Sequence, residues 1–181
     1  FDEAFSEPTK VIGRYMSEEE AQAETAKGNY VVKEENGYRR IVAAPKPIDI
    51  YEIDAIRALL DANQLVIAGG GGGIPVLQQG TRLKGASAVI EKDLTAARMA
   101  DMVDASTLLF LTGTEQVAIN YQKPDQFFVD ELTAEEARSY MEDGQFEAGS
   151  MLPKIEASVE FVSADKDRRA IITDLSLAKE A

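Results

Sequence analysis

The 181-residue sequence contains no cysteine and no histidine. Without cysteine the chain can form neither a disulfide framework nor a catalytic thiolate. Without histidine it lacks the usual general base near pH 7, a Ser-His-Asp triad and His-bound zinc. These two absences exclude the commonest forms of nucleophilic and zinc-dependent catalysis.

Positive charge is scarce, because 19 Lys and Arg stand against 32 Asp and Glu, a net charge of −13. Such a chain repels the phosphates of nucleic acid and the surface of an anionic membrane, so neither is an expected partner. No apolar run approaches the length of a membrane span and no signal peptide opens the sequence, so we expect a cytoplasmic protein. An anionic ligand would need a local basic site, which draws attention to lysines that lie near glycines.

The first quarter of the chain predicts a small α+β unit. The capping box Ser17-Glu18-Glu19-Glu20 starts a helix that Gly28 ends. Strands at 29–33 and 38–44 flank Asn36-Gly37, a dipeptide typical of hairpin turns. The segment Pro45-Lys46-Pro47 then closes the unit.

Short apolar strands alternate with helices in the remainder. The strands are predicted at 65–68, 107–111 and 170–173, and the helices at 49–61, 93–103, 133–141 and 153–162. Strands that are apolar throughout indicate a parallel sheet covered on both faces. The sequence therefore predicts a three-layer α/β/α sandwich with a mostly parallel sheet, plus the small protruding α+β subdomain.

Five consecutive glycines, Gly69, Gly70, Gly71, Gly72 and Gly73, follow the first of these strands and precede Ile-Pro. Ligands of α/β proteins bind beyond the carboxyl ends of strands, and bare backbone N–H groups can form a nest for an oxyanion. No Gly-Lys-Ser/Thr follows, so this is not a P-loop, and the glycines do not open a helix as a Rossmann fingerprint would. A flexible surface loop is the alternative, but the preceding strand and Pro75 favour anion binding.

Two lysines lie at predicted helix starts. Lys92 is followed by Asp93, and Lys154 ends the stretch Gly149-Ser150-Met151-Leu152-Pro153-Lys154. Helix capping is a sufficient structural reason for Asp93 and Ser150, which are expected at N-cap positions. Proline is common in the first turn of a helix, which accounts for Pro153. A cation at a helix N-terminus is unfavourable unless an anion lies there, so a phosphate held by both lysines and the glycine nest is the simplest common cause. Solvated lysines at ordinary helix starts are the alternative.

A further candidate region follows the strand at 107–111. Thr112-Gly113 comes directly after it, and Tyr121 lies in the polar stretch Asn120-Tyr121-Gln122-Lys123-Pro124. Turn chemistry accounts for Gly113 and Pro124. Tyr121 is equally consistent with a core position and with stacking on a base.

Six stretches, in this order, resemble the carbamate kinases of the amino-acid kinase family, and together they run through nearly the whole chain. They are PTKVIG (8–13), GYRRIVAAPKPIDI (37–50), AGGGGGIPV (68–76), LKGASAVIEKDL (83–94), LTGTEQVAINYQKPDQ (111–126) and GSMLPKIEA (149–157). The resemblance implies a homodimeric enzyme that reversibly transfers a phosphoryl group between ATP and carbamate. Such enzymes usually make ATP from ADP and carbamoyl phosphate.

The resemblance also implies roles for the candidate residues. Lys10 would contact carbamoyl phosphate, Lys92 and Lys154 would bracket the phosphoryl group, and Asp93 would orient the lysines or the metal shell. Gly69 to Gly73 would line the substrate and the transferring phosphate. The nucleotide would be held by Thr112, Gly113, Val117, Tyr121, Gly149, Ser150, Met151 and Pro153. Mg²⁺ would be bound mainly by phosphate oxygens, so no protein metal ligand is assigned. Phosphoryl transfer depends chiefly on positioning and charge neutralisation, which these groups supply.

The chain also departs from the family pattern. The N-terminal substrate-binding half with its Gly-Gly-Asn and His-Gly-Asn-Gly loops is missing, as is the C-terminal Gly-Lys-x-Gly-Thr segment. Val11 stands where the family usually has proline, and the stretch at 34–37 is shorter. The sequence begins at Phe1 without an initiator Met. We therefore expect an incomplete and inactive nucleotide-binding portion, formed by residues 1–10 and 48–181, with the protruding subdomain at 11–47.

Two other functions remain open. The chain could belong to another amino-acid kinase that acts on a different acid substrate such as glutamate, or on UMP. It could also be a nucleotide-binding module without enzymatic activity. The Pro-Thr-Lys motif and the protruding insert favour carbamate.

Overall fold

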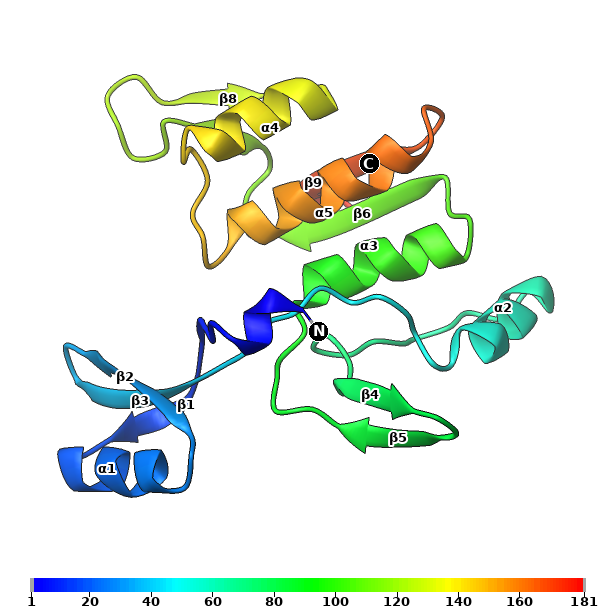
Figure 1. Ribbon diagram of the computed structural model, residues 1–181. Helices are drawn as coiled ribbons and strands as arrows, with labels where there is room; N and C mark the ends of the chain where they lie inside the picture. Colours follow the sequence, from blue (N-terminus) through cyan, green and yellow to red (C-terminus); the bar gives the residue numbers. More distant parts are fainter. Residues whose placement is uncertain (1, 181) are drawn as a thin grey trace. The chain divides into compact units, whose positions relative to one another are not determined.

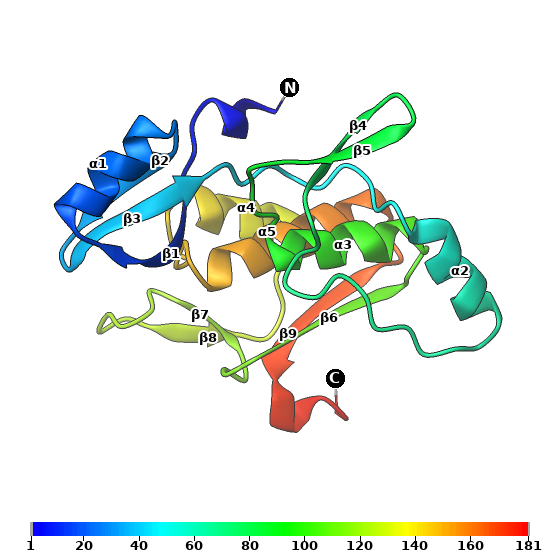
Figure 2. The same cartoon turned by 90° about the horizontal axis from the view of Figure 1, so that it is seen from below.

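The computed structural model describes residues 2–180 (Figures 1 and 2). The chain forms two compact units, which we describe separately. Unit 1 runs to Lys46 and also takes in Gly71–Glu91, and unit 2 comprises Pro47–Gly70 and the chain from Lys92 onward. The subdomain expected at residues 11–47 stays a prediction, because unit 1 includes a further segment.

Unit 1 is built around an antiparallel sheet with the order β1-β3-β2, shown in blue in Figure 1. Its elements are a 3-10 turn (Glu3–Phe5), β1 (Lys10–Met16), α1 (Glu18–Ala26), β2 (Tyr30–Glu34), β3 (Gly37–Val42), β4 (Val76–Gln79) and β5 (Arg82–Gly85). The predicted capping box is confirmed, because the Ser17 hydroxyl accepts from the Glu20 N–H and the Glu20 carboxylate accepts from the Ser17 N–H. The predicted β2–β3 hairpin is also confirmed. The strand β1 and the β4–β5 hairpin were not predicted.

The turn of the β2–β3 hairpin requires glycine at position 37. Gly37 has a φ of +132°, and a Cβ there would lie 2.8 Å from the Met16 carbonyl oxygen. Such a conformation strains residues that carry a side chain, and the close backbone neighbour cannot move aside easily. The Asn-Gly dipeptide therefore marks this turn for a physical reason.

Unit 2 contains a pair of parallel strands, β6 and β9, which align Thr107 with Arg169 and Thr112 with Asp174. Its elements are α2 (Ile53–Asp61), α3 (Lys92–Met102), β6 (Thr107–Thr112), β7 (Val117–Ile119), β8 (Phe127–Val129), α4 (Ala134–Glu142), α5 (Met151–Ala164), β9 (Arg169–Asp174) and a 3-10 turn (Leu175–Leu177). The strands predicted at 107–111 and 170–173 are confirmed, as are the four predicted helices, with ends that differ by a few residues. The hairpin of β7 and β8 was not predicted.

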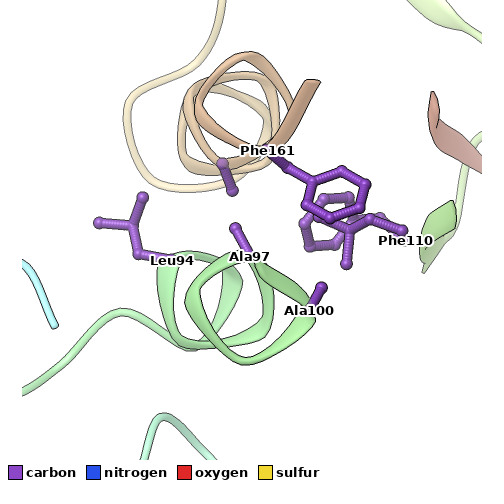
Figure 3. Close-up of a cluster of buried hydrophobic side chains, with 7 residues drawn as sticks. Leu94, Ala97, Ala100, Phe110 and Phe161 are labelled. Atoms are coloured by element: carbon purple, nitrogen blue, oxygen red, sulfur yellow. The ribbon is translucent and has the colours of Figure 1, made fainter. Parts of the chain in front are cut away.

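The main core of unit 2 lies where α3 and α5 pack on one face of β6 (Figure 3). Phe161 of α5 is 1% exposed and lies over Phe110 of β6, while Ala97 and Ala100 of α3 face it. Small alanines at this contact let the two helices approach closely, so that their first turns lie near each other. A second apolar cluster joins β7, α4 and α5.

Only the α/β class of the predicted three-layer parallel sandwich is confirmed, and the described residues differ from the rest of the prediction in two respects. First, β6–β9 is the one parallel strand pair among residues 2–180, and the other paired strands are antiparallel. Second, within the same residues only one face of β6 is covered, because Leu108 and Phe110 are buried whereas Leu109 and Leu111 are 38% and 42% exposed. The α/β class holds, but the second covering layer does not appear in the described part of the chain.

The strand predicted at 65–68 is also wrong. The segment forms no strand, and the side chains of Leu65 and Ile67 are 94% and 95% exposed. Its apolar, β-branched composition suits a strand, but a strand exists only when another strand satisfies its backbone N–H and C=O groups. None of the described residues pairs with this segment.

Candidate active site

A buried carboxylate in unit 2 binds both lysines that the sequence singled out. The Oδ2 atom of Asp93 lies 3.4 Å from Lys92 Nζ and 3.2 Å from Lys154 Nζ. The Asp93 side chain is 6% exposed and that of Lys154 12%, whereas that of Lys92 is 56% exposed. We call these three residues the lysine–aspartate cluster. Asp93 and Lys154 are 61 positions apart in sequence, and the α3–α5 packing brings them together.

The position of Asp93 corrects the sequence prediction. We predicted an N-cap, but α3 begins at Lys92, so Asp93 lies inside the first turn. A carboxylate there is favoured by the helix dipole, and its negative charge also offsets the cost of the two nearby ammonium groups. Asp93 therefore supplies part of the reason for lysines at these two helix starts. The cluster still carries two positive charges and one negative charge, in a chain whose net charge is −13.

The stretch before Lys154 differs from the prediction in one detail. Ser150 is the N-cap residue of α5, yet its side chain makes no capping hydrogen bond. Its hydroxyl donates to Glu147 Oε2 instead, and its carbonyl oxygen accepts from Lys154 Nζ at 3.4 Å. Gly149 is exposed just before it, and Pro153 lies in the first turn of the helix. The Ser150 carbonyl thus adds a second acceptor for the Lys154 ammonium.

The glycine run is required by backbone conformation and not by close neighbours. Gly69, Gly70, Gly72 and Gly73 have φ values of +79°, +49°, +129° and +88°. A Cβ would meet nothing within 4 Å at Gly70, Gly71 or Gly73, and only ordinary contacts at Gly69. The run therefore forms a left-handed loop that only glycine adopts freely, with open space beside it. Gly69 and Gly70 belong to unit 2, and Gly71 to Gly73 belong to unit 1.

A groove of about 320 Å³ in unit 2 joins the glycines to the lysine–aspartate cluster. It is lined by Gly69, Gly70 and Lys92, together with Thr95 and Met99 of α3 and further apolar residues. Glycine backbone and an ammonium-bearing side chain in the lining of an otherwise apolar groove suit a ligand with an anionic group. The structure thus brings together the two glycines, Lys92, Asp93 and Lys154.

Three of the predicted nucleotide residues, Thr112, Gly113 and Tyr121, lie elsewhere in unit 2. Thr112 ends β6 and Gly113 follows it. Tyr121 is 58% exposed in the β7–β8 loop, between Asn120 and Gln122, which have φ values of +53° and +61°. This loop is held by hydrogen bonds from the Asn120 N–H to Gln145 and from the Gln122 N–H to Gln126. The exposed Tyr121 ring, on a loop that hydrogen bonds hold in place, is consistent with stacking on a base.

Two other predicted nucleotide residues, Val117 and Met151, contribute to apolar packing. Val117 is 9% exposed in the second apolar cluster, and Met151 packs against that cluster. Val117 also lines a larger cavity of about 1000 Å³ between α4, α5 and β9, which sequence reasoning did not anticipate. That cavity contains none of the lysine–aspartate cluster. The cluster, and not this cavity, lies beside Gly69 and Gly70.

Lys10 lies in unit 1, at the start of β1, where its Nζ donates to Glu91 Oε2 at 2.8 Å. Sequence reasoning gave Glu91 no role. The structure therefore adds Glu91 to the candidate residues.

Two negative findings concern metals and membranes. Among residues 2–180, no three or more carboxylates gather where they could bind a metal ion. Asp93 is engaged by two ammonium groups, so the protein groups fit a Mg²⁺ ion that arrives bound to phosphate oxygens better than one held by side chains. Within the same residues, every helix is too short or too polar to span a membrane.

Comparison with known proteins gives consistent matches. The sequence profile of the amino acid kinase family matches residues 13–174. The carbamate kinase-like protein YqeA of Escherichia coli (strain K12) is 50% identical over 181 residues, which cover 99% of this chain and 58% of that protein. The carbamate kinase of Clostridium perfringens (strain 13 / Type A) is 47% identical over 182 residues, with the same shares of 99% and 58%.

Solved structures agree with these relatives. The carbamate kinase from Giardia lamblia bound to AMP-PNP matches with a TM-score of 0.91 and 38% identity, covering 99% of this chain and 57% of that one. The protein from Aeropyrum pernix K1 matches with a TM-score of 0.89 and 33% identity, over 99% and 58%. The chain thus spans less than two thirds of the length of the relatives that it matches.

Proposed function

From the premise that this chain belongs to the amino-acid kinase family and has its α/β fold, we propose that it is the nucleotide-binding portion of a carbamate kinase. The observation that carries the proposal is the lysine–aspartate cluster beside Gly69 and Gly70. The names of these relatives and the AMP-PNP in the Giardia lamblia structure support the same reaction and nucleotide.

In the proposed reaction, a β-phosphate oxygen of ADP attacks the phosphorus of carbamoyl phosphate. The bond between that phosphorus and the carbamoyl oxygen breaks, and ATP and carbamate leave. Negative charge is spread over the three oxygens of the migrating group, so ammonium groups and backbone N–H groups placed around it lower the barrier. Lys92, Lys154 and the glycine amides would provide these donors.

Asp93 would hold the two ammonium groups in place before substrate arrives. Two lysines brought close together repel each other, and a shared carboxylate offsets that repulsion. Because Asp93 is already bound to both, we assign it to orienting the lysines and not to the metal shell. Mg²⁺ would enter with the nucleotide as part of the substrate.

The exposed apolar surfaces of unit 2 support the view that the active enzyme needs more than these residues. Leu109 and Leu111 are exposed on β6, and Leu65 and Ile67 are exposed after α2. Exposed apolar surface of this kind is unusual in a finished monomer. We therefore expect the 181-residue chain to bind ADP and to lack turnover by itself.

The test compares this chain with a version extended to the length of its relatives. ADP with Mg²⁺ is titrated into each by calorimetry, and ATP formation from ADP and carbamoyl phosphate is measured in each. We expect binding in both and turnover only in the extended protein. Lys92→Ala and Lys154→Ala should abolish most of that turnover, whereas Lys166→Ala, a change at an exposed lysine outside the cluster, should not.

The alternatives predict different results. If the extended protein phosphorylates glutamate or UMP but not carbamate, the chain belongs to another kinase of the family. If ADP binds and neither version turns over any of these substrates, the nucleotide-binding module is the better description. Full turnover in both lysine variants would show that the site is assigned wrongly.

A further inference from the structure

Lys10 and Glu91 form an ion pair within unit 1 although 81 positions separate them in sequence. The Lys10 Nζ atom lies 2.8 Å from Glu91 Oε2, and the two side chains are 40% and 19% exposed. Lys10 was assigned to carbamoyl phosphate through the family resemblance alone. The pair gives that lysine a partner that neither the motif nor the comparisons assign.

The backbone of unit 1 brings the two side chains together. Lys10 opens β1 opposite Val42, near the end of β3. Ala43, the residue directly after that strand, forms a parallel bridge with Ala88, and the Val89 N–H donates to the Ala43 carbonyl at 2.9 Å. One strand end therefore fixes both the lysine and the segment that ends in Glu91. The contact follows from sheet register and is not a chance meeting of two surface side chains.

The geometry suits control of orientation better than attraction of a ligand. An ammonium group has three N–H donors, of which one points to Glu91, and the Lys10 side chain is exposed enough for a ligand to reach it. A lysine side chain without a partner samples many rotamers. A charge-assisted hydrogen bond to a largely buried carboxylate restricts these rotamers before any ligand binds. The carboxylate itself would repel an anionic ligand, so its benefit lies in placing the ammonium.

We propose that Glu91 is a positioning residue that holds the Lys10 ammonium in the orientation needed to contact an anionic oxygen of carbamoyl phosphate. The proposal rests on the proposed function, because that function assigns Lys10 to the substrate. Glu91 acts through Lys10 and does not itself touch the substrate.

The first experiment tests the pair without any need for activity. The 181-residue chain is reductively methylated with formaldehyde and cyanoborohydride, and the labelling rate of Lys10 is followed by peptide mass spectrometry. Glu91→Gln should raise that rate about threefold, because the charge-assisted bond is lost, and Glu91→Asp should give a smaller increase. Glu20→Gln is the matched control, since it breaks the exposed Arg14–Glu20 pair of the same unit and should leave Lys10 unchanged.

The second experiment measures kinetics in the extended protein. Glu91→Gln should lower kcat about tenfold, since a loosely placed group contributes less to the transition state. The KM for carbamoyl phosphate should stay the same or fall, because a repelling carboxylate is gone, and the KM for ADP and the melting temperature should not change. Glu91→Asp should recover part of kcat, which a purely structural role would not require.

The outcomes separate the two proposals. An unchanged Lys10 labelling rate in Glu91→Gln overturns the positioning role whatever the activity, as does a kcat within twofold of the wild type. A fall in kcat matched by an equal loss of folded protein also overturns it. If the wild-type extended protein makes no ATP from carbamoyl phosphate, the proposed function fails, and the labelling experiment still decides whether Glu91 holds Lys10.

Discussion

Replacing Asp93 by asparagine tests the lysine–aspartate cluster directly. The change removes the negative charge that binds both ammonium groups, and it leaves Lys154, whose side chain is 12% exposed, with neutral acceptors only, the Ser150 carbonyl and the amide oxygen of the new Asn. Removing one partner of a buried ion pair costs about 3–5 kcal/mol, because the other charge stays buried without compensation. The retained Ser150 contact and the exposure of Lys92 place the expected loss at the lower end, about 3 kcal/mol.

The loss is measured as the free energy of unfolding in urea and as the melting temperature. For a chain of this size, 1 kcal/mol corresponds to roughly 2–4 °C, so we expect a fall of roughly 6–12 °C. Asp104→Asn is the matched control, because Asp104 is 92% exposed and 3.8 Å from Arg168, and it should cost less than about 0.5 kcal/mol. The double variant Asp93→Asn with Lys154→Met should be more stable than Asp93→Asn alone, since it removes the uncompensated charge. A loss for Asp93→Asn no larger than that of the control, or a double variant that recovers nothing, would refute the reasoning.

Three further predictions concern the core, the glycine loop and an exposed ion pair. Phe161→Ala should cost about 3–5 kcal/mol in urea unfolding, because the ring is 1% exposed at the α3–α5 contact, and a loss under about 1 kcal/mol would contradict that packing. Gly70→Ala should destabilise by about 1–2 kcal/mol because its φ is +49°, whereas Gly71→Ala, whose φ is not positive, should not, and equal effects would contradict the loop conformation. Arg14 holds the pKa of Glu20 down to about 2, so this pair stabilises the fold above the ordinary pKa of 4.5 and the stabilisation is lost as the pH falls toward 2. An NMR titration of the Glu20 carboxyl with a midpoint near 4.5 would show that the pair does not form in solution.

Local signals in the sequence predicted their elements correctly. The capping box at Ser17 and the predicted helix start at Thr133 both form reciprocal capping hydrogen bonds, because every partner lies within three residues. The Asn36-Gly37 turn is correct for the same reason. Where the residues that determine an element lie within one turn of each other, the local sequence is enough to predict that element.

Errors arose where the cause lies far away along the chain. Asp93 was interpreted as a cap because its neighbours in sequence suggested one, but its partner Lys154 is 61 residues away. The sequence suggested an anionic ligand as the reason for the two lysines, whereas a carboxylate of the chain itself, Asp93, contacts both and supplies part of that reason. Glu91 was missed because its contact with Lys10 depends on sheet register that no local pattern reveals.

The segment at 65–68 gives the sharpest contrast between sequence and structure, and a substitution can decide between them. If Leu65 and Ile67 are about 95% exposed, as they are here, then Leu65→Ser with Ile67→Ser should change the free energy of unfolding of the 181-residue chain by less than about 0.5 kcal/mol. If the segment were instead the buried strand that its composition predicts, each substitution would remove about 1.5–3 kcal/mol of apolar burial. Ile53→Ser with Ile56→Ser is the matched control, because both side chains are 7% exposed in α2 and their loss should destabilise the chain in either case. A double variant at 65 and 67 as unstable as this control would mean that the segment is packed in solution, and the exposed apolar surface described for unit 2 would then be smaller than the structure shows.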